Sequence, residues 1–302
     1  MPVFDTEFIT TALLRAAQIG GRICMEKRHK ASISFKPIEA PCKPIVALAS
    51  SIVTDADLAV QEAILQTLLD CGLQDCIVQA EEDTALISKF HFHEGHATIF
   101  VDPIDGTLTY ALGCRDWEIH AAKAGFERRL LQQTKERLDP RFYGIVLGAL
   151  IPQLAPIAVC MLPELQTVFY SKGGAAFRNG TALKYIFPGG PTCVAIGRRL
   201  LDSNGESATP FASAGVNAHW FSGSAPAVLW QLFEGTCTSY VELACGFDAQ
   251  LAAMAAQAAG LMVCDRNGKD IVFNPYGKID SIIIASSTKE RDSICEVLRC
   301  YS

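Results

Sequence analysis

The chain has 302 residues, half of them apolar, which is enough for a sizeable core and is typical of one- or two-domain globular proteins. Its formal net charge of −6 argues against a nucleic-acid polymer as partner, because the phosphate backbone selects basic surfaces. The twelve cysteines show no Cys-x-x-Cys spacing and several lie inside apolar runs, so they indicate free thiols and a reducing, cytoplasmic location rather than a disulfide framework.

The predicted elements begin with a helix over residues 6–25, whose early charged residues argue against a signal peptide. A second helix over residues 55–69 has apolar residues at helical spacing. Strands follow before residues 81 and 102, and later over residues 144–151, 157–162 and 167–170. The second half alternates helices and strands and ends on a helix, so the sequence predicts an α/β protein.

Residues 144–163 form an uncharged stretch long enough to cross a membrane. Pro152 and Pro156 interrupt it in the middle, where a proline would break a helix. Two strands joined by a turn are the better interpretation, and we expect no membrane partner.

The most informative motif is Asp102-Pro103-Ile104-Asp105-Gly106-Thr107, between a strand-like run and a short helical stretch. Carboxylates suit hard cations such as Mg²⁺, and free N–H groups at a helix start suit a phosphate. The motif therefore indicates metal-assisted phosphoryl chemistry. The alternative is an ordinary turn in which Asp105 caps the helix and Gly106 makes the bend.

Three further acidic stretches each have a structural interpretation when taken alone. Glu81-Glu82-Asp83 could be a solvated helix start, and Thr54 and Asp57 have the spacing of a capping box. Asp248 precedes an alanine-rich helix over residues 249–259 that Gly260 closes, so it is well placed as an N-cap.

Taken in order, these motifs resemble the lithium-sensitive, Mg²⁺-dependent phosphatase superfamily. It includes inositol monophosphatases, inositol polyphosphate 1-phosphatases and 3′(2′),5′-bisphosphate nucleotidases. The turn at residues 174–180 and Gly223-Ser224-Ala225 are similar to further family motifs, and the resemblance runs from about residue 6 to 298. It implies a layered αβαβα sandwich, a single domain over residues 1–302 whose halves, 1–185 and 186–302, meet at the metal site.

The resemblance also implies roles for individual residues, with two or three Mg²⁺ ions bound. Glu81, Asp102 and the Ile104 carbonyl would hold one ion, and Asp102, Asp105 and Asp248 a second; a third would sit near Glu81. Thr107, oriented by Asp57, would help to deprotonate the attacking water. The N–H groups of Gly106 and Thr107 would hold the phosphate, and Gly223, Ser224, Ala225 and Glu242 would contact the alcohol portion.

The expected function is a Mg²⁺-dependent phosphomonoesterase acting on a small phosphorylated polyol such as an inositol phosphate, sensitive to lithium and homodimeric by resemblance. One alternative is a bisphosphate nucleotidase acting on adenosine 3′,5′-bisphosphate, and a remote one is a non-catalytic metal-binding scaffold. Glu242 favours the polyol because a carboxylate accepts hydrogen bonds from vicinal hydroxyls. A second phosphate would favour Arg or Lys, which the basic run from Arg128 to Arg141 could supply.

Some features depart from the family pattern. Phe247 stands where a Trp is usual, Gln250 stands where the family often has a small residue, and residues 126–154 form a longer segment than expected. The cluster His91, His93 and His96 could hold Zn²⁺ if it lay on a strand, although a polar connection is the simpler interpretation.

Overall fold

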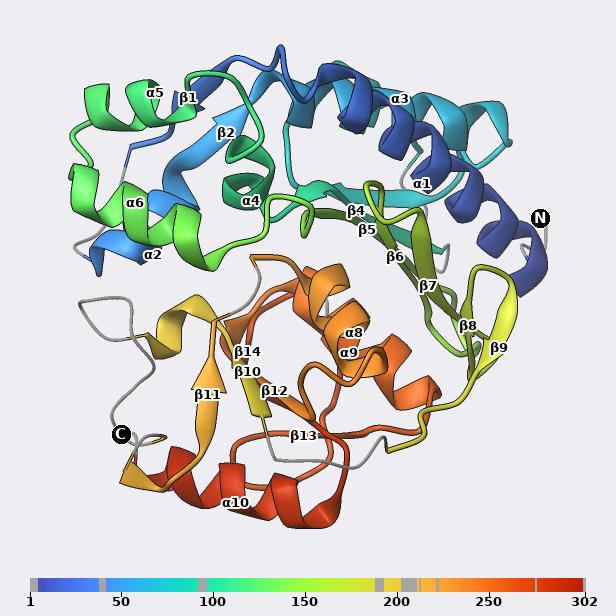
Figure 1. Cartoon of the computed structure of the whole chain (residues 1–302). Helices are drawn as coiled ribbons and strands as arrows, with labels where there is room; N and C mark the ends of the chain where they lie inside the picture. The colour runs from blue at the N-terminus through green and yellow to red at the C-terminus, as the bar shows by residue number, and fades with distance from the viewer. Residues whose placement is uncertain are drawn as a thin grey trace.

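The computed structural model describes residues 5–37, 42–91, 97–187, 193–201, 211, 213–220, 223–274 and 276–300. Its helices and sheets form five layers (Figure 1). Helices α1 (Thr6–Lys27) and α3 (Asp55–Asp70) cover one face of a seven-stranded sheet, and α8 (Ala225–Phe233) and α9 (Phe247–Ala258) lie between this sheet and a five-stranded one. Helix α10 (Thr288–Arg299) covers the far face of the second sheet, so the predicted αβαβα sandwich is confirmed.

The seven-stranded sheet has the strand order β3-β4-β5-β6-β7-β8-β9. Strands β3 and β4 pair in parallel, and every later neighbour is antiparallel. The bounds are β3 (Ile77–Ala80), β4 (Thr98–Asp105), β5 (Gly144–Leu150), β6 (Ile157–Leu162), β7 (Thr167–Lys172), β8 (Ala175–Arg178) and β9 (Thr181–Leu183). The uncharged stretch at 144–163 therefore forms β5 and β6, as predicted. Among the described residues, no helix is long and apolar enough to cross a membrane.

The five-stranded sheet has the order β11-β10-β12-β14-β13. Strands β10 (Cys193–Ile196), β11 (Asn217–His219) and β12 (Ser239–Cys245) run parallel, and β13 (Met262–Cys264) and β14 (Ile279–Ala285) complete the sheet with antiparallel pairs. The remaining short elements are β1 (Ile33–Phe35), α2 (Pro44–Ser51), β2 (Ile52–Thr54), η1 (Ala85–Lys89), α4 (Thr107–Ala111), α5 (Trp117–Lys123), α6 (Arg128–Arg137) and η2 (Arg198–Leu200).

The alanine-rich sequence of α9 lets this helix pack tightly between the two sheets. Most of its alanines are buried, and small side chains allow a close approach of the backbones. A Cβ atom at Gly148 of β5 would lie only 2.4 Å from Leu251 Cδ2 of α9. The helix that carries Asp248 is thus fixed firmly against the sheet that carries Asp102.

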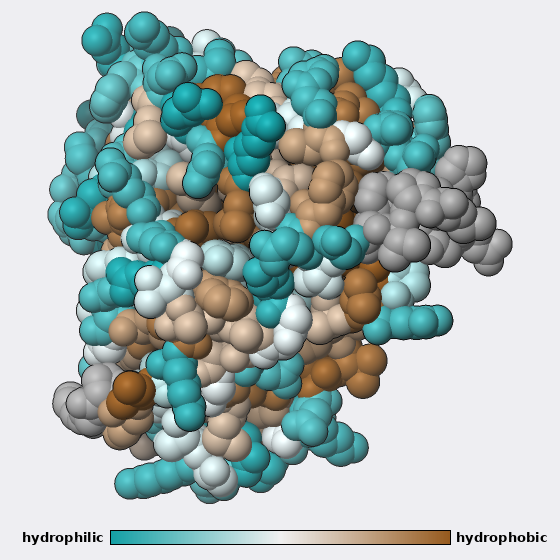
Figure 2. Space-filling view, turned by 90° about the vertical axis from the view of Figure 1, so that its right-hand side faces the viewer, coloured by the Kyte–Doolittle hydropathy of each residue, from teal (hydrophilic) through white to brown (hydrophobic). Residues whose placement is uncertain are grey.

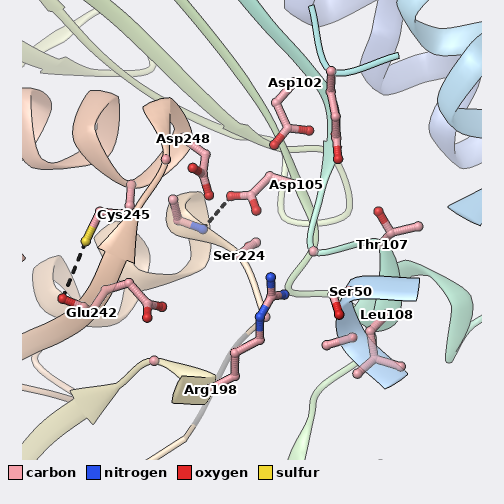
Figure 3. Close-up of a pocket in the computed structure, with 18 of the residues that line it drawn as sticks. Ser50, Asp102, Asp105, Thr107, Leu108, Arg198, Ser224, Glu242, Cys245 and Asp248 are labelled. Carbon is pink, nitrogen blue, oxygen red and sulfur yellow. Dashed lines mark hydrogen bonds between the residues drawn. The ribbon is translucent and has the colours of Figure 1, made fainter. Parts of the chain in front are cut away.

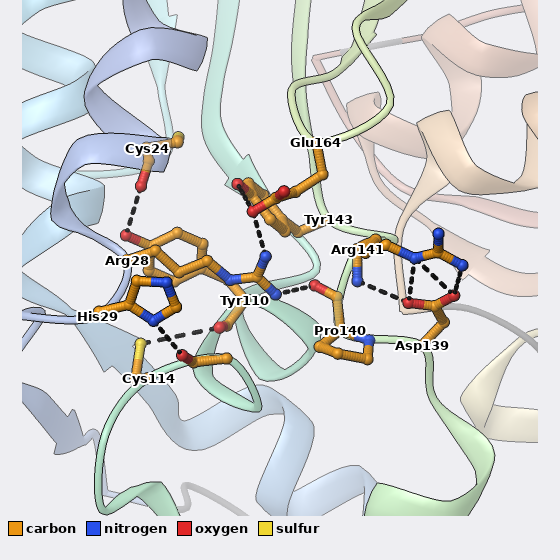
Figure 4. A network of polar contacts seen from close by, with 11 residues as sticks. Cys24, Arg28, His29, Tyr110, Cys114, Asp139, Pro140, Arg141, Tyr143 and Glu164 are labelled. Atoms are coloured by element: carbon orange, nitrogen blue, oxygen red, sulfur yellow. Dashed lines mark hydrogen bonds and ion pairs between the residues drawn. The ribbon is translucent and has the colours of Figure 1, made fainter.

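A buried arginine network fixes the end of α1 next to α4 (Figure 4). Arg28, the C-cap of α1 and only 6% exposed, forms an ion pair with Glu164 and donates to the carbonyl oxygen of Pro140. Its guanidinium lies over the Tyr143 ring, 4.8 Å from the centroid. The Tyr110 hydroxyl of α4 donates to the Cys24 carbonyl at 3.0 Å. Because a buried guanidinium needs such partners, the network stabilises the connections around α4.

The predicted N-terminal cap of α3 agrees with the structure, and that of α9 does not. At α3, the Thr54 N–H and hydroxyl donate to Asp57 Oδ2 at 2.8 and 2.7 Å, so the predicted reach of Asp57 back to the cap is confirmed. At α9 the N-cap is Gly246, and the prediction that Asp248 caps the helix is wrong. Asp248 is the second residue of the helix, in its first turn, and does not occupy the cap position.

The Asn-Gly turn of the 174–180 motif is a hairpin connection. Asn179 and Gly180 join β8 to β9, and both have positive φ, 49° and 83°. Two such residues form the tight turn whose twist matches that of a hairpin, and Asn and Gly are the residues that adopt it most readily. This part of the motif therefore has a local structural reason.

The surface is largely hydrophilic with scattered apolar residues. On the face shown in Figure 2, hydrophilic side chains dominate the top and bottom, and apolar ones show mainly in the band between them. All twelve cysteines are described and free, in agreement with the predicted absence of disulfides.

Candidate active site

A bulge in strand β4 brings two carboxylates to the same side of the sheet. Residues three apart on a regular strand point to opposite faces. Here Asp102 pairs with Val146 and Asp105 with Gly144, so β4 has one residue more than β5 between the two pairs. The extra residue reverses the alternation and turns the Asp105 side chain toward that of Asp102.

Asp248, in the first turn of α9, completes a group of three carboxylates (Figure 3). One oxygen from each of Asp102, Asp105 and Asp248 lies within 4.8 Å of the other two. Asp102 Oδ1 is buried and has no hydrogen-bond partner among the described residues. An unpaired carboxylate oxygen inside a protein is costly unless a cation or a proton compensates it, so this donor set fits a divalent metal ion.

The electrostatics of the group lead to the same conclusion. Burial, and then the neighbouring carboxylates, raise the pKa values of Asp102 and Asp105 well above their ordinary range. Burial raises the pKa of Glu81, the residue directly after β3, to about 7, and the neighbouring Asp102 side chain acts against that rise. Four crowded acids stay ionised together only if positive charge lies among them.

The Thr107 hydroxyl lies between this acidic group and Asp57. Thr107 Oγ1 is 3.3 Å from Asp57 Oδ1 and 3.0 Å from the Ile104 carbonyl oxygen. Asp57 is buried, which raises its pKa to about 6, the capping bonds from Thr54 acting in the opposite direction. The capping carboxylate of α3 therefore also contacts the hydroxyl at the start of α4.

Gly106 is the residue around which the two halves of the chain meet. It has φ of +84°, and a Cβ atom there would lie 2.9 Å from Ser224 Cβ and 3.0 Å from the Gly223 carbonyl oxygen. Gly106, rather than Asp105, is the N-cap of α4. Asp105 Oδ2 instead accepts a 2.5 Å hydrogen bond from the N–H of Ala225, the first residue of α8. The predicted phosphate-binding and alcohol-binding segments are thus adjacent.

Glu242 lies in the same pocket, at the end of the regular part of β12. Its Oε1 accepts from the Leu243 N–H at 2.9 Å, and its Oε2 accepts from the Tyr240 hydroxyl at 3.2 Å. Arg199 Nη1 lies 3.9 Å from Oε1. The carboxylate is therefore held by the pocket wall, and burial raises its pKa while these contacts act against that rise.

The pocket has a volume of about 360 Å³ and includes all the predicted site residues except Asp57. Sequence reasoning missed its cationic side chains, Lys36, Arg198, Arg199 and Lys278. Arg198 and Arg199 follow the carboxyl end of β10, and ligands often bind beyond strand ends, so this position was an available signal. The described lining residues include none from the 126–154 segment, which forms α6 and β5 instead.

The histidine cluster takes no part in this site where it is described. His91 Nδ1 lies 3.4 Å from Asp75 Oδ1 on the surface, and His93 and His96 lie outside the described residues. Phe247, in place of the usual Trp, lines the pocket and packs against Phe100 with ring centroids 5.7 Å apart.

The five layers and the buried acidic pocket define a layered α/β protein with a site suited to a divalent metal ion. A family model described as the inositol monophosphatase family matches residues 5–302. The chain therefore belongs to the inositol monophosphatase family, whose members are phosphatases that generally use divalent metal ions.

Solved structures share the fold at low sequence identity. The extragenic suppressor protein SuhB of Bartonella henselae has a TM-score of 0.68 and 16% identity, with 96% of this chain and 98% of that chain covered. A staphylococcal inositol monophosphatase-1 in a LiCl-soaked inhibitory complex gives 0.68 and 14%, with 98% and 96% covered. An inositol monophosphatase/NADP phosphatase complexed with NADP and Ca²⁺ gives a TM-score of 0.67 and 14% identity, with 98% of this chain and 96% of that chain covered. No curated protein sequence matches the chain.

Proposed function

We propose that this protein is a Mg²⁺-dependent phosphomonoesterase that hydrolyses a small phosphorylated polyol such as an inositol phosphate. The observation that carries the proposal is the group formed by Asp102, Asp105 and Asp248, whose oxygens lie within 4.8 Å of one another in a pocket shared with Gly106 and Thr107. Metal-assisted phosphoryl transfer needs this combination of a carboxylate cage and an anion cradle.

The carboxylates would hold two Mg²⁺ ions, and a third more weakly. Glu81, Asp102 and the Ile104 carbonyl form one set of ligands, and Asp102, Asp105 and Asp248 form the other. Glu81 approaches Asp102 from the neighbouring strand β3, and the unpaired Asp102 Oδ1 is available as a shared ligand atom. When bound, Mg²⁺ makes a water molecule more acidic and neutralises charge on the transferred phosphoryl group.

The other residues of the site bind the phosphate and move the proton. The N–H groups of Gly106 and Thr107, at the start of α4, donate to the phosphate oxygens. Thr107 accepts the proton of the attacking water as its own hydroxyl proton moves toward Asp57 Oδ1, which lies 3.3 Å away. The backbone contacts of Thr54 keep Asp57 in that position.

The alcohol portion of the substrate would lie against Gly223, Ser224, Ala225 and Glu242, which line the same pocket. Glu242 retains lone pairs for substrate hydroxyls, which favours a polyol. A bisphosphate nucleotidase is the second candidate, and the cationic side chains of the pocket favour it. We also propose a homodimer, a cytoplasmic location and one catalytic domain spanning residues 1–302.

A panel of phosphomonoesters assayed for phosphate release tests the proposal. The panel should include inositol 1-phosphate, inositol 1,4-bisphosphate, adenosine 3′-phosphate and adenosine 3′,5′-bisphosphate, each with Mg²⁺ and with a chelator. We expect Mg²⁺-dependent release with the highest kcat/KM for an inositol phosphate. A preference above tenfold for the adenosine bisphosphate would replace the polyol by the nucleotide, and no release from any ester would favour a binding protein.

A further inference from the structure

The pocket has two separate acidic regions with a cationic side chain between them. Asp102, Asp105 and Asp248 lie close together in the pocket, and Glu242 lies apart from them (Figure 3). Arg198, from the short helix η2 after strand β10, points into the space between Asp105 and Glu242 (Figure 3). Its charge opposes the rise in pKa that burial causes at both carboxyls, and it acts on Glu242 more strongly than any other charged group does.

The Arg198 side chain has no hydrogen bond or ion pair with any described residue, although it is only partly exposed. Its neighbour Arg199 differs, because Arg199 Nη1 donates to the Leu243 carbonyl at 2.9 Å and lies 3.9 Å from Glu242 Oε1. Lys36, a third cation of the pocket, is paired with Glu82 at 2.8 Å. Lys278, the fourth, is exposed and therefore already hydrated. Arg198 is the pocket cation that combines partial burial with the lack of a partner.

The contacts of Glu242 and Arg199 fix both side chains in the pocket wall, so Arg199 is not available to a substrate in the way that Arg198 is. Arg199 stabilises the stretch at Ala244, where β12 departs from regular pairing with β14 and φ is +50°. Glu242 packs so closely on η2 that a Cβ atom at Gly197 would lie 2.0 Å from its Oε2. The carboxylate and Arg199 thus form one fixed wall, and Arg198 projects from it toward the substrate space.

We propose that Arg198 binds a second anionic group, a phosphate, on the alcohol portion of the substrate. A partly dehydrated guanidinium without a protein partner is stabilised by an anion, and its five N–H donors match a phosphate in a bidentate arrangement. The scissile phosphate has its own donors at Gly106 and Thr107 near the carboxylate group. The proposal rests on the proposed phosphomonoesterase activity and narrows its substrates to those with two phosphates, on a polyol or on a nucleoside.

Two matched pairs of compounds test this inference and distinguish the two carriers of the phosphate. The pairs are inositol 1-phosphate with inositol 1,4-bisphosphate, and adenosine 3′-phosphate with adenosine 3′,5′-bisphosphate. For at least one pair we expect Arg198→Gln to lower kcat/KM for the bisphosphate by about tenfold to a hundredfold, as expected for loss of a charge-assisted contact. The monophosphate of that pair should change less than about threefold.

Arg129→Gln, on the exposed side of α6, is the matched control and should leave both members of each pair unchanged. Arg198→Lys should be intermediate, because it keeps the charge and loses the fork of donors. An equal loss for both members of each pair would overturn the inference, since Arg198 would then act on the scissile phosphate. No loss for any compound would overturn it as well.

Binding measured by calorimetry with Ca²⁺ in place of Mg²⁺ gives the same comparison independently of turnover. An Arg198-dependent preference for a bisphosphate without any turnover would support the recognition site and contradict the proposed activity. Turnover of monophosphates and bisphosphates without an Arg198-dependent preference, in kinetics or in binding, would support the activity and contradict the recognition site.

Discussion

Asp105 Oδ2, at the end of strand β4, accepts a 2.5 Å hydrogen bond from the backbone N–H of Ala225 at the start of helix α8. The two residues are 120 positions apart and belong to different halves of the chain. A carboxylate proposed to bind metal thus also connects the seven-stranded sheet to the helix layer. One of its oxygens is used by α8, and the other remains for the acidic group.

The contact between Thr107 and Asp57 makes a kinetic prediction. Thr107→Val should lower kcat by about 10²–10⁴-fold, since it removes the hydroxyl proposed to take the proton and keeps the side-chain shape. Asp57→Asn should give a similar loss, and the double variant should be little worse than either single one. Thr109→Val is the matched control, because the buried Thr109 hydroxyl has no hydrogen-bond partner among the described residues. Additive losses in the double variant would contradict a functional dyad.

The buried acids predict that stability depends on pH and metal together. Burial raises the pKa of Asp57 to about 6 and that of Glu81 to about 7. These acids bind protons more tightly in the folded chain than in the unfolded chain. Their contribution to the stability of the metal-free protein is therefore greatest below about pH 4 and is lost as the pH rises to about 7.

Bound Mg²⁺ should offset that loss, because it supplies the positive charge that the ionised acids lack. The rise in melting temperature on adding Mg²⁺ should therefore be larger at pH 8 than at pH 5, with NaCl at matched ionic strength as the control. An equal rise at both pH values would contradict a metal held by these carboxylates.

We expect the buried side chain of Gln250, two residues after Asp248, to stabilise the folded protein. Its buried side-chain amide donates to the carbonyls of Gly277 at 2.9 Å and Asn274 at 3.1 Å, and accepts from the Asn274 N–H at 2.8 Å. Gln250→Leu should lower the free energy of unfolding by about 3 kcal/mol, because it leaves these backbone groups unpaired. Gln257→Leu, exposed on the same helix, should change it by less than about 0.5 kcal/mol. Equal denaturant midpoints for the two variants would contradict this role.

The acidic site could be predicted largely from sequence because its information is local. Asp102 and Asp105 lie in one six-residue motif whose residue types indicate a metal site, whereas Asp248 taken alone indicated a helix cap and was selected by resemblance to the phosphatase family. The bulge that brings Asp102 and Asp105 to one face could not be read from spacing, because it depends on pairing with Gly144 of β5.

The sequence did not indicate which arginine side chains enter the pocket, because their roles depend on packing. Arg198 and Arg199 are adjacent and identical in type, yet one is fixed by Leu243 and the other is free. Only the packing of β12 against η2 distinguishes them. The basic run of α6 was a more obvious source of charge in the sequence, but it does not line the pocket.

Lithium should inhibit at concentrations where sodium does not. The carboxylates proposed for the second metal position, Asp102, Asp105 and Asp248, lie together, and a staphylococcal inositol monophosphatase-1 that shares the fold forms an inhibitory complex on soaking with LiCl. Titration with LiCl and NaCl at matched ionic strength checks this. Indistinguishable responses to the two salts would contradict lithium sensitivity and leave the phosphatase proposal in place.

Phosphate release by the purified protein and by Asp105→Asn, each with and without Mg²⁺, tests the account most directly. The carboxamide keeps an oxygen for the Ala225 N–H and removes the charge needed for metal binding, so the fold should persist while kcat falls by about 10³-fold or more. Asp280→Asn, on an exposed side chain, should retain full activity. Mg²⁺-dependent release that disappears in Asp105→Asn alone is the predicted result, and near-normal kcat in that variant at ordinary Mg²⁺ would contradict the metal site.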